Sequence, residues 1–207
     1  MNLVQKKKYF CKIFRKAENK YRWSVKRLSA EGWAKDWQML IAIIMSAQSR
    51  DETTIPIAEN LFLNYTSLDK LANADYNEVL NIFRSLNYNR TKARNAISAA
   101  KHLINHFSGR VPDSLEELIE VPGVGRKTAN LVLSEIHNKD SICVDTHVHR
   151  ISNVLGFVKT KNPTETEFEL MKIAPRKYWS RINRIFVLWG KDAPGRDKRK
   201  LLQALDR

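Results

Sequence analysis

The sequence predicts an all-α protein, and three observations support this fold class. Apolar residues recur at helical spacing along most of the 207 residues. Residues that cap helices stand where these apolar segments begin. A continuous strand pattern is missing, since the best candidate, Ser141-Ile-Cys-Val144, is too short to build a sheet. A chain of this length can form one large domain or two small ones.

The first half of the chain contains five predicted helices. Residues 3–27 place apolar side chains opposite a basic face and predict the first of them. Asp36 can cap the second, whose body from Trp37 to Ala47 is apolar on almost every side, so we expect it to be the buried central helix. The others are expected from Asp51 through Leu63, from Asp75 to about Phe83, and from Thr91 to His106.

The second half begins with two short helices separated by a glycine turn. Ser114-Leu-Glu-Glu117 has the pattern of a capping box and predicts a helix start. Val121-Pro-Gly-Val-Gly125 ends that helix, and the next is expected from Arg126 to about His137. Later helices are predicted from Asp145 through Leu155 and near residues 164–173 and 178–189.

Positive charge is concentrated at both ends of the chain. The formal net charge is +14, yet residues 28–171 carry 15 basic and 18 acidic side chains. Residues 1–27 carry ten basic side chains against Glu18 alone, and residues 172–200 carry ten against two aspartates. The two ends either meet in one positive surface that faces a polyanion or form two independently solvated helices. Aromatic residues interleaved in both ends favour the single surface.

The cysteine content and hydropathy exclude several classes of protein. Cys11 and Cys143 are the only cysteines, which rules out a disulfide scaffold and any metal site needing several thiolates. No apolar run approaches the ~20 residues of a membrane span, and the N-terminal residues lack the apolar core of a signal peptide. We therefore expect an intracellular protein of the cytoplasm or nucleoid, with no metal or other cofactor.

The glycine turn between two helices is the most specific local signal. Gly123 and Gly125 allow backbone N–H groups to point outward together at the start of a helix, where the helix dipole favours an anion. Such contacts hold the phosphates of DNA without reading its sequence. Arg126 and Thr128 are weaker candidates for the same role. The alternative is an ordinary turn between two helices.

A lysine and an aspartate near this turn could carry chemistry. Lys127 lies in the first turn of the second helix, where a cation is locally unfavourable, and the neutral amine is the form that a nucleophile needs. Asp145 follows the apolar stretch Ile142–Val144 and could cap a helix with one oxygen while presenting the other to a cleft. An amine and a carboxylate suffice for Schiff-base chemistry at a sugar C1′. The alternatives are a phosphate-binding lysine and a purely structural cap.

Four separated motifs stand out in the sequence. They are Leu118-Ile-Glu-Val-Pro-Gly-Val-Gly-Arg-Lys-Thr-Ala-Asn-Leu-Val-Leu133 with Val144-Asp-Thr-His-Val-His-Arg150, Leu40-Ile-Ala-Ile-Ile-Met-Ser-Ala-Gln-Ser-Arg-Asp51, Tyr88-Asn-Arg-Thr-Lys-Ala93, and Phe186-Val-Leu-Trp-Gly190. Together they resemble the endonuclease III family of DNA glycosylases, in the family's order, over roughly residues 28–190. The resemblance implies a two-domain helix-hairpin-helix architecture. Its first domain would span residues 28–138, with the hairpin at 114–137, and its second would pair residues 1–27 with 139–207.

The resemblance also implies roles for individual residues. Lys127 would attack C1′ of the damaged nucleotide, expel the base and form an imine with the opened sugar, and Asp145 would stabilise the positive charge on that sugar. Gln48 would fill the hole left by the flipped nucleotide, and Tyr88 would wedge into the base stack. Read without the resemblance, Gln48 could satisfy backbone groups at a helix end, and Tyr88 could be a surface aromatic. We expect His147 to be structural.

The chain departs from the family pattern in two places. Many members hold a [4Fe–4S] cluster with four cysteines near the C-terminus, but no cysteine follows Cys143 here. Residues 196–200, which are rich in Arg and Lys, either replace the DNA contacts of that region or form a solvated tail. Asn-Tyr-Asn at 87–89 stands where relatives show glycine with an aromatic or leucine. We expect apolar packing to hold the second domain, through Phe10, Phe14, Trp179, Ile182, Phe186 and Trp189.

These observations predict a bifunctional DNA glycosylase and AP lyase of base excision repair that lacks the iron–sulfur cluster. We expect a monomer that acts on double-stranded DNA, excises damaged pyrimidines, oxidised ones above all, and cleaves the strand by β-elimination. The alternatives are a glycosylase for uracil or thymine mismatches, a lyase confined to abasic sites, and a DNA-binding protein without catalysis. A DNA-binding protein without catalysis would not need the pair of Lys127 and Asp145, and Lys127 argues against a glycosylase that has no lyase activity.

Overall fold

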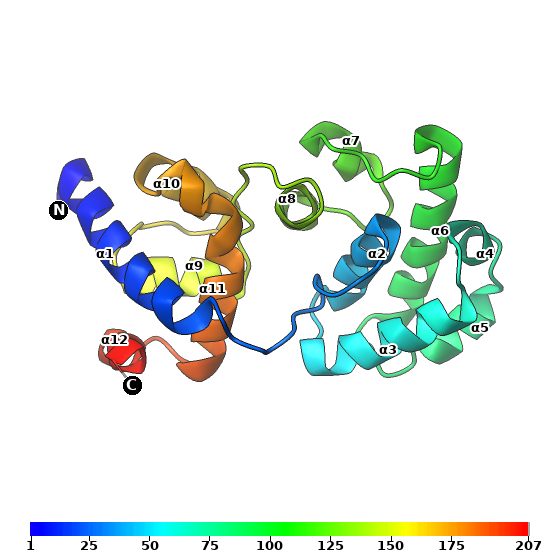
Figure 1. Ribbon diagram of the computed structural model, residues 1–207, viewed down its shortest axis with the longest axis horizontal. Coiled ribbons are helices and arrows are strands. Elements are labelled where there is room, and N and C mark those ends of the chain that lie inside the picture. The colour runs from blue at the N-terminus through cyan, green and yellow to red at the C-terminus, as the bar shows by residue number, and fades with distance from the viewer. Residues whose placement is uncertain (207) are drawn as a thin grey trace. The chain divides into compact units, whose positions relative to one another are not determined.

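The computed structural model describes residues 1–206, in which helices are connected by turns and no strand occurs. The helices are α1 (Leu3–Tyr21), α2 (Asp36–Ser46), α3 (Asp51–Asn64), α4 (Leu68–Ala72), α5 (Tyr76–Ile82), α6 (Asn89–Phe107), α7 (Leu115–Glu120), α8 (Arg126–Glu135), α9 (Thr146–Val154), α10 (Pro163–Ile173), the short 3₁₀ helix η1 (Arg176–Tyr178), α11 (Trp179–Asp192) and α12 (Lys198–Asp206) (Figure 1). The all-α prediction is confirmed. Among these described residues, no helix is both long and apolar enough to cross a membrane.

The chain forms two compact units. Residues 27–137 make up the hairpin unit, and residues 1–26 together with 138–207 make up the basic unit. Each boundary lies one residue from the expected position. The basic unit carries 24 Lys and Arg against 9 Asp and Glu, whereas the hairpin unit carries 12 against 13. The positive charge of the protein therefore resides in the unit that contains both chain ends.

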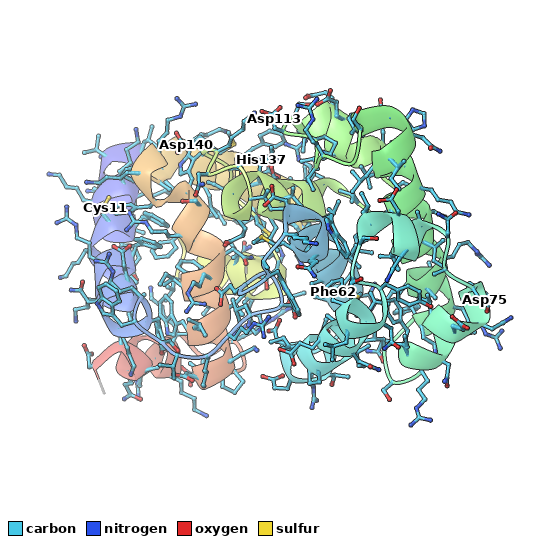
Figure 2. The ribbon with its side chains drawn as sticks, turned by 45° about the vertical axis from the view of Figure 1, so that its right-hand side comes forward. Cys11, Phe62, Asp75, Asp113, His137 and Asp140 are labelled. Atoms are coloured by element: carbon cyan, nitrogen blue, oxygen red, sulfur yellow. The ribbon has the colours of Figure 1, made fainter. Side chains whose placement is uncertain are left out.

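Helix α2 is the core of the hairpin unit. Its residues Leu40 to Met45 are buried in an unbroken run, and the helix contacts α3, α6 and α8 (Figure 1). Trp37 packs edge-on against Phe62 of α3, with ring centroids 5.4 Å apart; Figure 2 labels Phe62. A helix that is apolar on all sides is stable only when other elements surround it. The position of α2 is as predicted, and the surrounding helices are fixed against it.

The basic unit is held by aromatic packing between α1 and α11. Phe14 lies 4.7 Å from Tyr178 and 6.2 Å from Phe186, measured between ring centroids. Glu18, which is buried on α1, forms an ion pair with Arg181 of α11. The six apolar residues expected to stabilise this domain are all buried. The two ends of the chain therefore meet in one unit, as the charge distribution predicted.

Helices α9 and α11 cross at Gly190 with almost no space between them. A Cβ at Gly190 would lie 2.2 Å from His147 Nδ1 and 2.9 Å from an Arg150 guanidinium nitrogen. Arg150 donates to the carbonyls of Gly190 (3.1 Å), Ala193 (3.2 Å) and Gly195, so it holds the turn that follows α11. This guanidinium clamp, made by Arg150 on the carbonyls of Gly190, Ala193 and Gly195, orders the turn without any cysteine.

Several helix boundaries differ from the sequence prediction. Helix α1 ends at Tyr21, not at residue 27, because a turn closes where Ser24 N donates to the Tyr21 carbonyl. Asp36 and Asp51 lie inside the first turns of α2 and α3 instead of at their caps. Asp51 accepts from Ser29 N (3.0 Å) and Ser29 Oγ (2.6 Å), which secures the segment before α2.

Two helices were not predicted. The five-residue α4 is too short to show an apolar period, although Ser67 caps it as expected of a helix start. Helix α12 includes most of the basic run, and Asp197 accepts from the N–H groups of Arg199 and Lys200 at its beginning. Leu201 is buried and Trp189 donates to its carbonyl, so α12 is packed against α11, whereas the side chains of residues 196–200 are exposed.

We expect the close crossing at Gly190 to tolerate no side chain. Gly190→Ala should lower the free energy of unfolding by about 2 kcal/mol or more, because the methyl group overlaps His147 and Arg150. Gly125→Ala is the matched control, since a Cβ there meets nothing within 4 Å, and its effect should stay below ~1 kcal/mol. Urea denaturation measures both. Equal effects of the two substitutions would contradict the packing described.

Candidate active site and nucleic-acid interface

The hairpin between α7 and α8 rests directly on α2 and α6. Ser114 accepts from Glu117 N (3.2 Å) and donates to its carboxylate (2.7 Å), so α7 begins as predicted. Gly123 has a φ of +86°, and a Cβ there would lie 2.9 Å from Asn95 and 3.1 Å from Ile44. Both the backbone conformation and the contact exclude a side chain at this position. The hairpin is therefore seated on one residue of each neighbouring helix.

Gly125 opens the start of α8 to a ligand. This residue is exposed, has extended backbone at the N-cap, and provides no capping side chain. The first hydrogen bond of the helix runs from Ala129 N to the Gly125 carbonyl (2.9 Å). Neither its φ nor its surroundings require glycine, and the helix begins without a side chain at its N-cap. That arrangement suits a phosphate.

The side chains around this helix start differ in exposure. Lys127 is exposed at the second position of α8, and Arg126 is half-buried. Thr128 is buried, with 7% of its surface exposed, so it can offer a surface anion its backbone N–H but not its hydroxyl. Of the three, Lys127 is the side chain that solvent or substrate can reach most readily.

Asp145 belongs to the basic unit and caps α9. Its Oδ1 accepts from Val148 N at 2.8 Å, which uses one of the two carboxylate oxygens. The preceding residues, Ile142 to Val144, are buried, and Asn183 donates to the Cys143 carbonyl (3.2 Å). The capping prediction is confirmed. Because its backbone is anchored on both sides, the half-buried Asp145 holds a fixed position in its unit.

Gln48 and Tyr88 both have left-handed backbone conformations and exposed side chains. Their φ angles are +54° and +57°. This conformation is uncommon for residues other than glycine and costs about 1 kcal/mol or more at each position. Gln48 lies in the turn between α2 and α3, and Tyr88, 64% exposed, is the N-cap of α6. Holding both side chains outward therefore lowers the free energy of unfolding.

The turns that contain Gln48 and Tyr88 are joined by two hydrogen bonds. Asn87 Nδ2 donates to the Gln48 carbonyl at 2.7 Å. Lys92 Nζ donates to Ser49 Oγ, also at 2.7 Å, from the buried side. Burial lowers the pKa of Lys92 to about 8. The turns of Gln48 and Tyr88, two residues singled out from the sequence and 40 positions apart, are therefore brought together in the hairpin unit.

Sequence reasoning did not single out Asn87, Lys92 or Arg150. One signal in the sequence pointed to Asn87, because this asparagine stands where relatives have glycine in the loop at 86–90. Arg150 is part of a recognised motif, but its carbonyl acceptors come from a turn 40 to 45 residues later. Burial lowers the pKa of Arg150, and the charge of Asp145 opposes that effect.

The chain is similar to known proteins over most of its length. Residues 41–176 match the model of the HhH-GPD superfamily, described as base excision DNA repair proteins. Endonuclease III of Thermotoga maritima is 43% identical over 155 residues, which is 75% of this chain and 73% of that protein. Endonuclease III of Bacillus subtilis is 33% identical over 156 residues, 75% of this chain and 71% of that protein.

Solved structures agree with the sequence relatives. A trapped endonuclease III–DNA covalent intermediate, in an estranged-adenine complex, superposes with a TM-score of 0.83 at 32% identity and covers 89% of this chain and 86% of that one. A thermostable thymine-DNA glycosylase superposes with a TM-score of 0.77 at 16% identity, covering 94% of this chain and 90% of that one, which shows a shared fold.

The helix-hairpin-helix and the all-α fold define the class, and the chain belongs to the HhH-GPD superfamily of base excision DNA repair proteins. Within that class, its identity to curated relatives over about three quarters of its length makes it a member of the endonuclease III family.

The residues present do not fit the iron–sulfur cluster that many members of the family hold. Cys11 lies on α1 (Figure 2) and Cys143 precedes α9, and two thiols cannot supply the four ligands of such a cluster. Residues 1–206 contain no group of three His, Cys, Asp or Glu placed to hold a metal ion. The turn after α11 is instead bound by the guanidinium clamp of Arg150.

We expect the buried charge of Lys92 to make stability depend on pH. The unfolded chain binds the lysine proton more tightly than the folded protein does, so the cost of burying the charge disappears as the pH rises from 8 to 10. The wild-type free energy of unfolding should therefore rise by roughly 2 kcal/mol over that range relative to Lys92→Met. Lys101→Met, at an exposed position of α6, is the control and should follow the wild type. A constant difference between wild type and Lys92→Met would contradict the assignment.

Proposed function

We propose that this member of the endonuclease III family excises damaged pyrimidines from double-stranded DNA, oxidised ones above all, and then cleaves the strand at the abasic site. It acts as a bifunctional DNA glycosylase and AP lyase. The observation that carries the proposal is the position of Lys127, an exposed lysine at the second position of a helix that begins at a glycine N-cap with no capping side chain. A purely DNA-binding hairpin has no need of an amine at this position.

The chemistry follows from an amine and a carboxylate. The neutral amine of Lys127 attacks C1′, and the base leaves with the electron pair of the glycosidic bond. Loss of an amine proton and opening of the sugar ring give a protonated imine, which makes the hydrogen at C2′ acidic. Removal of that proton expels the 3′ phosphate by β-elimination and cuts the strand. Asp145, which caps α9 with one oxygen, stabilises the positive sugar and transfers protons with the other.

Gln48 and Tyr88 would act on the duplex instead of the sugar. Extruding a nucleotide costs a few kcal/mol and leaves a gap in the base stack. The exposed Gln48 side chain fills that gap and faces the unpaired base, and the exposed Tyr88 ring wedges into the stack. Gly123, Gly125 and the N–H groups of Arg126 and Thr128 hold the phosphates nearby. Lesion choice depends partly on the 86–90 loop, so a panel of oxidised, deaminated and mismatched bases would define the substrate.

The enzyme would work as a monomer inside the cell, at the nucleoid, without an iron–sulfur cluster. The support for a cluster-free enzyme is the cysteine content together with the clamp of Arg150 on the turn after α11. That turn leads into α12, where Arg199 and Lys200 are exposed. These side chains, with the exposed lysines of α1, would contact DNA phosphates on either side of the lesion.

We expect Lys127→Gln to keep DNA affinity and to lose strand cleavage by at least about 100-fold, because the amide cannot form an imine. Cleavage of a duplex with one abasic site measures the loss, and anisotropy of the same labelled duplex measures binding. Lys101→Gln, at an exposed lysine of α6, is the control and should cleave at the wild-type rate. Normal cleavage by Lys127→Gln would show that another group is the nucleophile.

The affinity for duplex DNA should fall steeply as the salt concentration rises. For each phosphate neutralised, log K should fall by about 0.9 for every tenfold increase in salt concentration. Removing phosphate contacts with Arg199→Gln and Lys200→Gln should reduce this slope. The comparison is Lys70→Gln, because the exposed Lys70 lies in the hairpin unit, whose net charge is nearly zero. This substitution should leave the slope unchanged. Titrations at several KCl concentrations measure the slopes. An unchanged slope for the Arg199 and Lys200 variants would place the DNA away from α12.

A further inference from the structure

Two exposed, left-handed residues are connected in a way that their separate roles do not require. Gln48 follows α2 and Tyr88 precedes α6, so each could be displayed by its own turn. Instead, Asn87 reaches from the residue beside Tyr88 and donates its Nδ2 hydrogen to the Gln48 carbonyl at 2.7 Å. The peptide group that sets the direction of Gln48 is thereby bound to the neighbour of Tyr88.

The bridge is anchored on both sides. Leu86, the residue before Asn87, is buried, and its N–H donates to Phe83 (2.8 Å). On the other side, Asn89 donates to the Arg84 carbonyl at 3.1 Å and so closes its own loop. Asn87 itself is exposed, and these two contacts hold the backbone on either side of it.

A second contact supports the Gln48 turn from its buried side. Lys92, one turn into α6, is buried and donates to Ser49 Oγ at 2.7 Å, while its N–H donates to the Tyr88 carbonyl at 3.0 Å. Gln48 and Ser49 are therefore both bound by residues of the Tyr88 segment, one from the exposed side and one from the buried side. This double attachment fixes the two turns relative to each other.

We propose that Asn87 is a positioning residue that preassembles Gln48 and Tyr88 into a single wedge for entering duplex DNA. This inference rests on the proposed function. Two side chains that must enter the stack together lose less conformational freedom on binding when they are already fixed in place. The free-energy cost of their left-handed conformations therefore arises during folding and not at each encounter with DNA.

Two abasic substrates separate this role from catalysis. A duplex substrate requires the wedge, whereas an abasic site in single-stranded DNA has no stack to enter and no partner base to face. Asn87→Ala should lower kcat/KM for cleavage of the duplex by about 3- to 10-fold, as expected for one lost hydrogen bond, and leave cleavage of the single strand unchanged. Asn73→Ala is the matched control, since Asn73 also donates to a backbone carbonyl, that of Asp69, within its own element.

A double-mutant cycle tests whether Asn87 acts through Gln48. If it does, Asn87→Ala should have little further effect on duplex cleavage in a Gln48→Ala background, because the side chain it positions is gone. Thermal denaturation of each variant accompanies the kinetics. A variant with a normal melting temperature and the duplex-specific loss supports the proposal.

Each contrary result has a distinct meaning. Equal losses on both substrates, or effects of Asn87→Ala and Gln48→Ala that simply add, would overturn the wedge while leaving the enzyme's activity intact. Cleavage of the duplex by Asn87→Ala at the wild-type rate would also overturn it. If the wild-type protein cleaves neither substrate, the proposed function itself fails.

Discussion

The seating of Gly123 on α2 and α6 is the contact on which the site depends. The hairpin backbone approaches Asn95 and Ile44 so closely that a methyl group would not fit. Helix α8, which displays Lys127, is thereby fixed to the same two helices that display Gln48 and Tyr88. Helix α2 can serve as this platform because it is apolar on all sides and surrounded by other helices. The position of the hairpin is thus a consequence of core packing within its unit.

Charge and chemistry are divided between the two units. The hairpin unit holds Lys127, Gln48 and Tyr88 and is nearly neutral, while the basic unit holds Asp145 and the net positive charge. Nonspecific attraction to phosphates depends on net charge, whereas nucleotide extrusion depends on geometry. In the proposed function, each unit would meet one of these two requirements. Within the basic unit, Arg150 organises the turn after α11 and also lies on the helix that Asp145 caps.

Much of this could be read from the sequence because it is encoded locally. Asp145 and Ser114 are capping residues next to apolar periods, and the all-apolar Trp37–Ala47 segment allows only a central position. The roles of Lys127 and Asp145 came from family motifs. The contacts of Asn87, Lys92 and Arg150 could not be predicted, because each joins residues about 40 apart whose meeting depends on the tertiary fold. The left-handed conformations of Gln48 and Tyr88 carry no sequence mark, since neither position is glycine.

The central claim is that Lys127 is the amine that reacts with the sugar. The most direct measurement is to reduce the reaction of the wild-type protein on an abasic duplex with borohydride, digest the adduct and locate the modified lysine by mass spectrometry. The reduced sugar is expected on the peptide that contains Lys127. A sugar attached to another lysine, such as Lys92 beneath the wedge, or an adduct at the N-terminal amine, would contradict it.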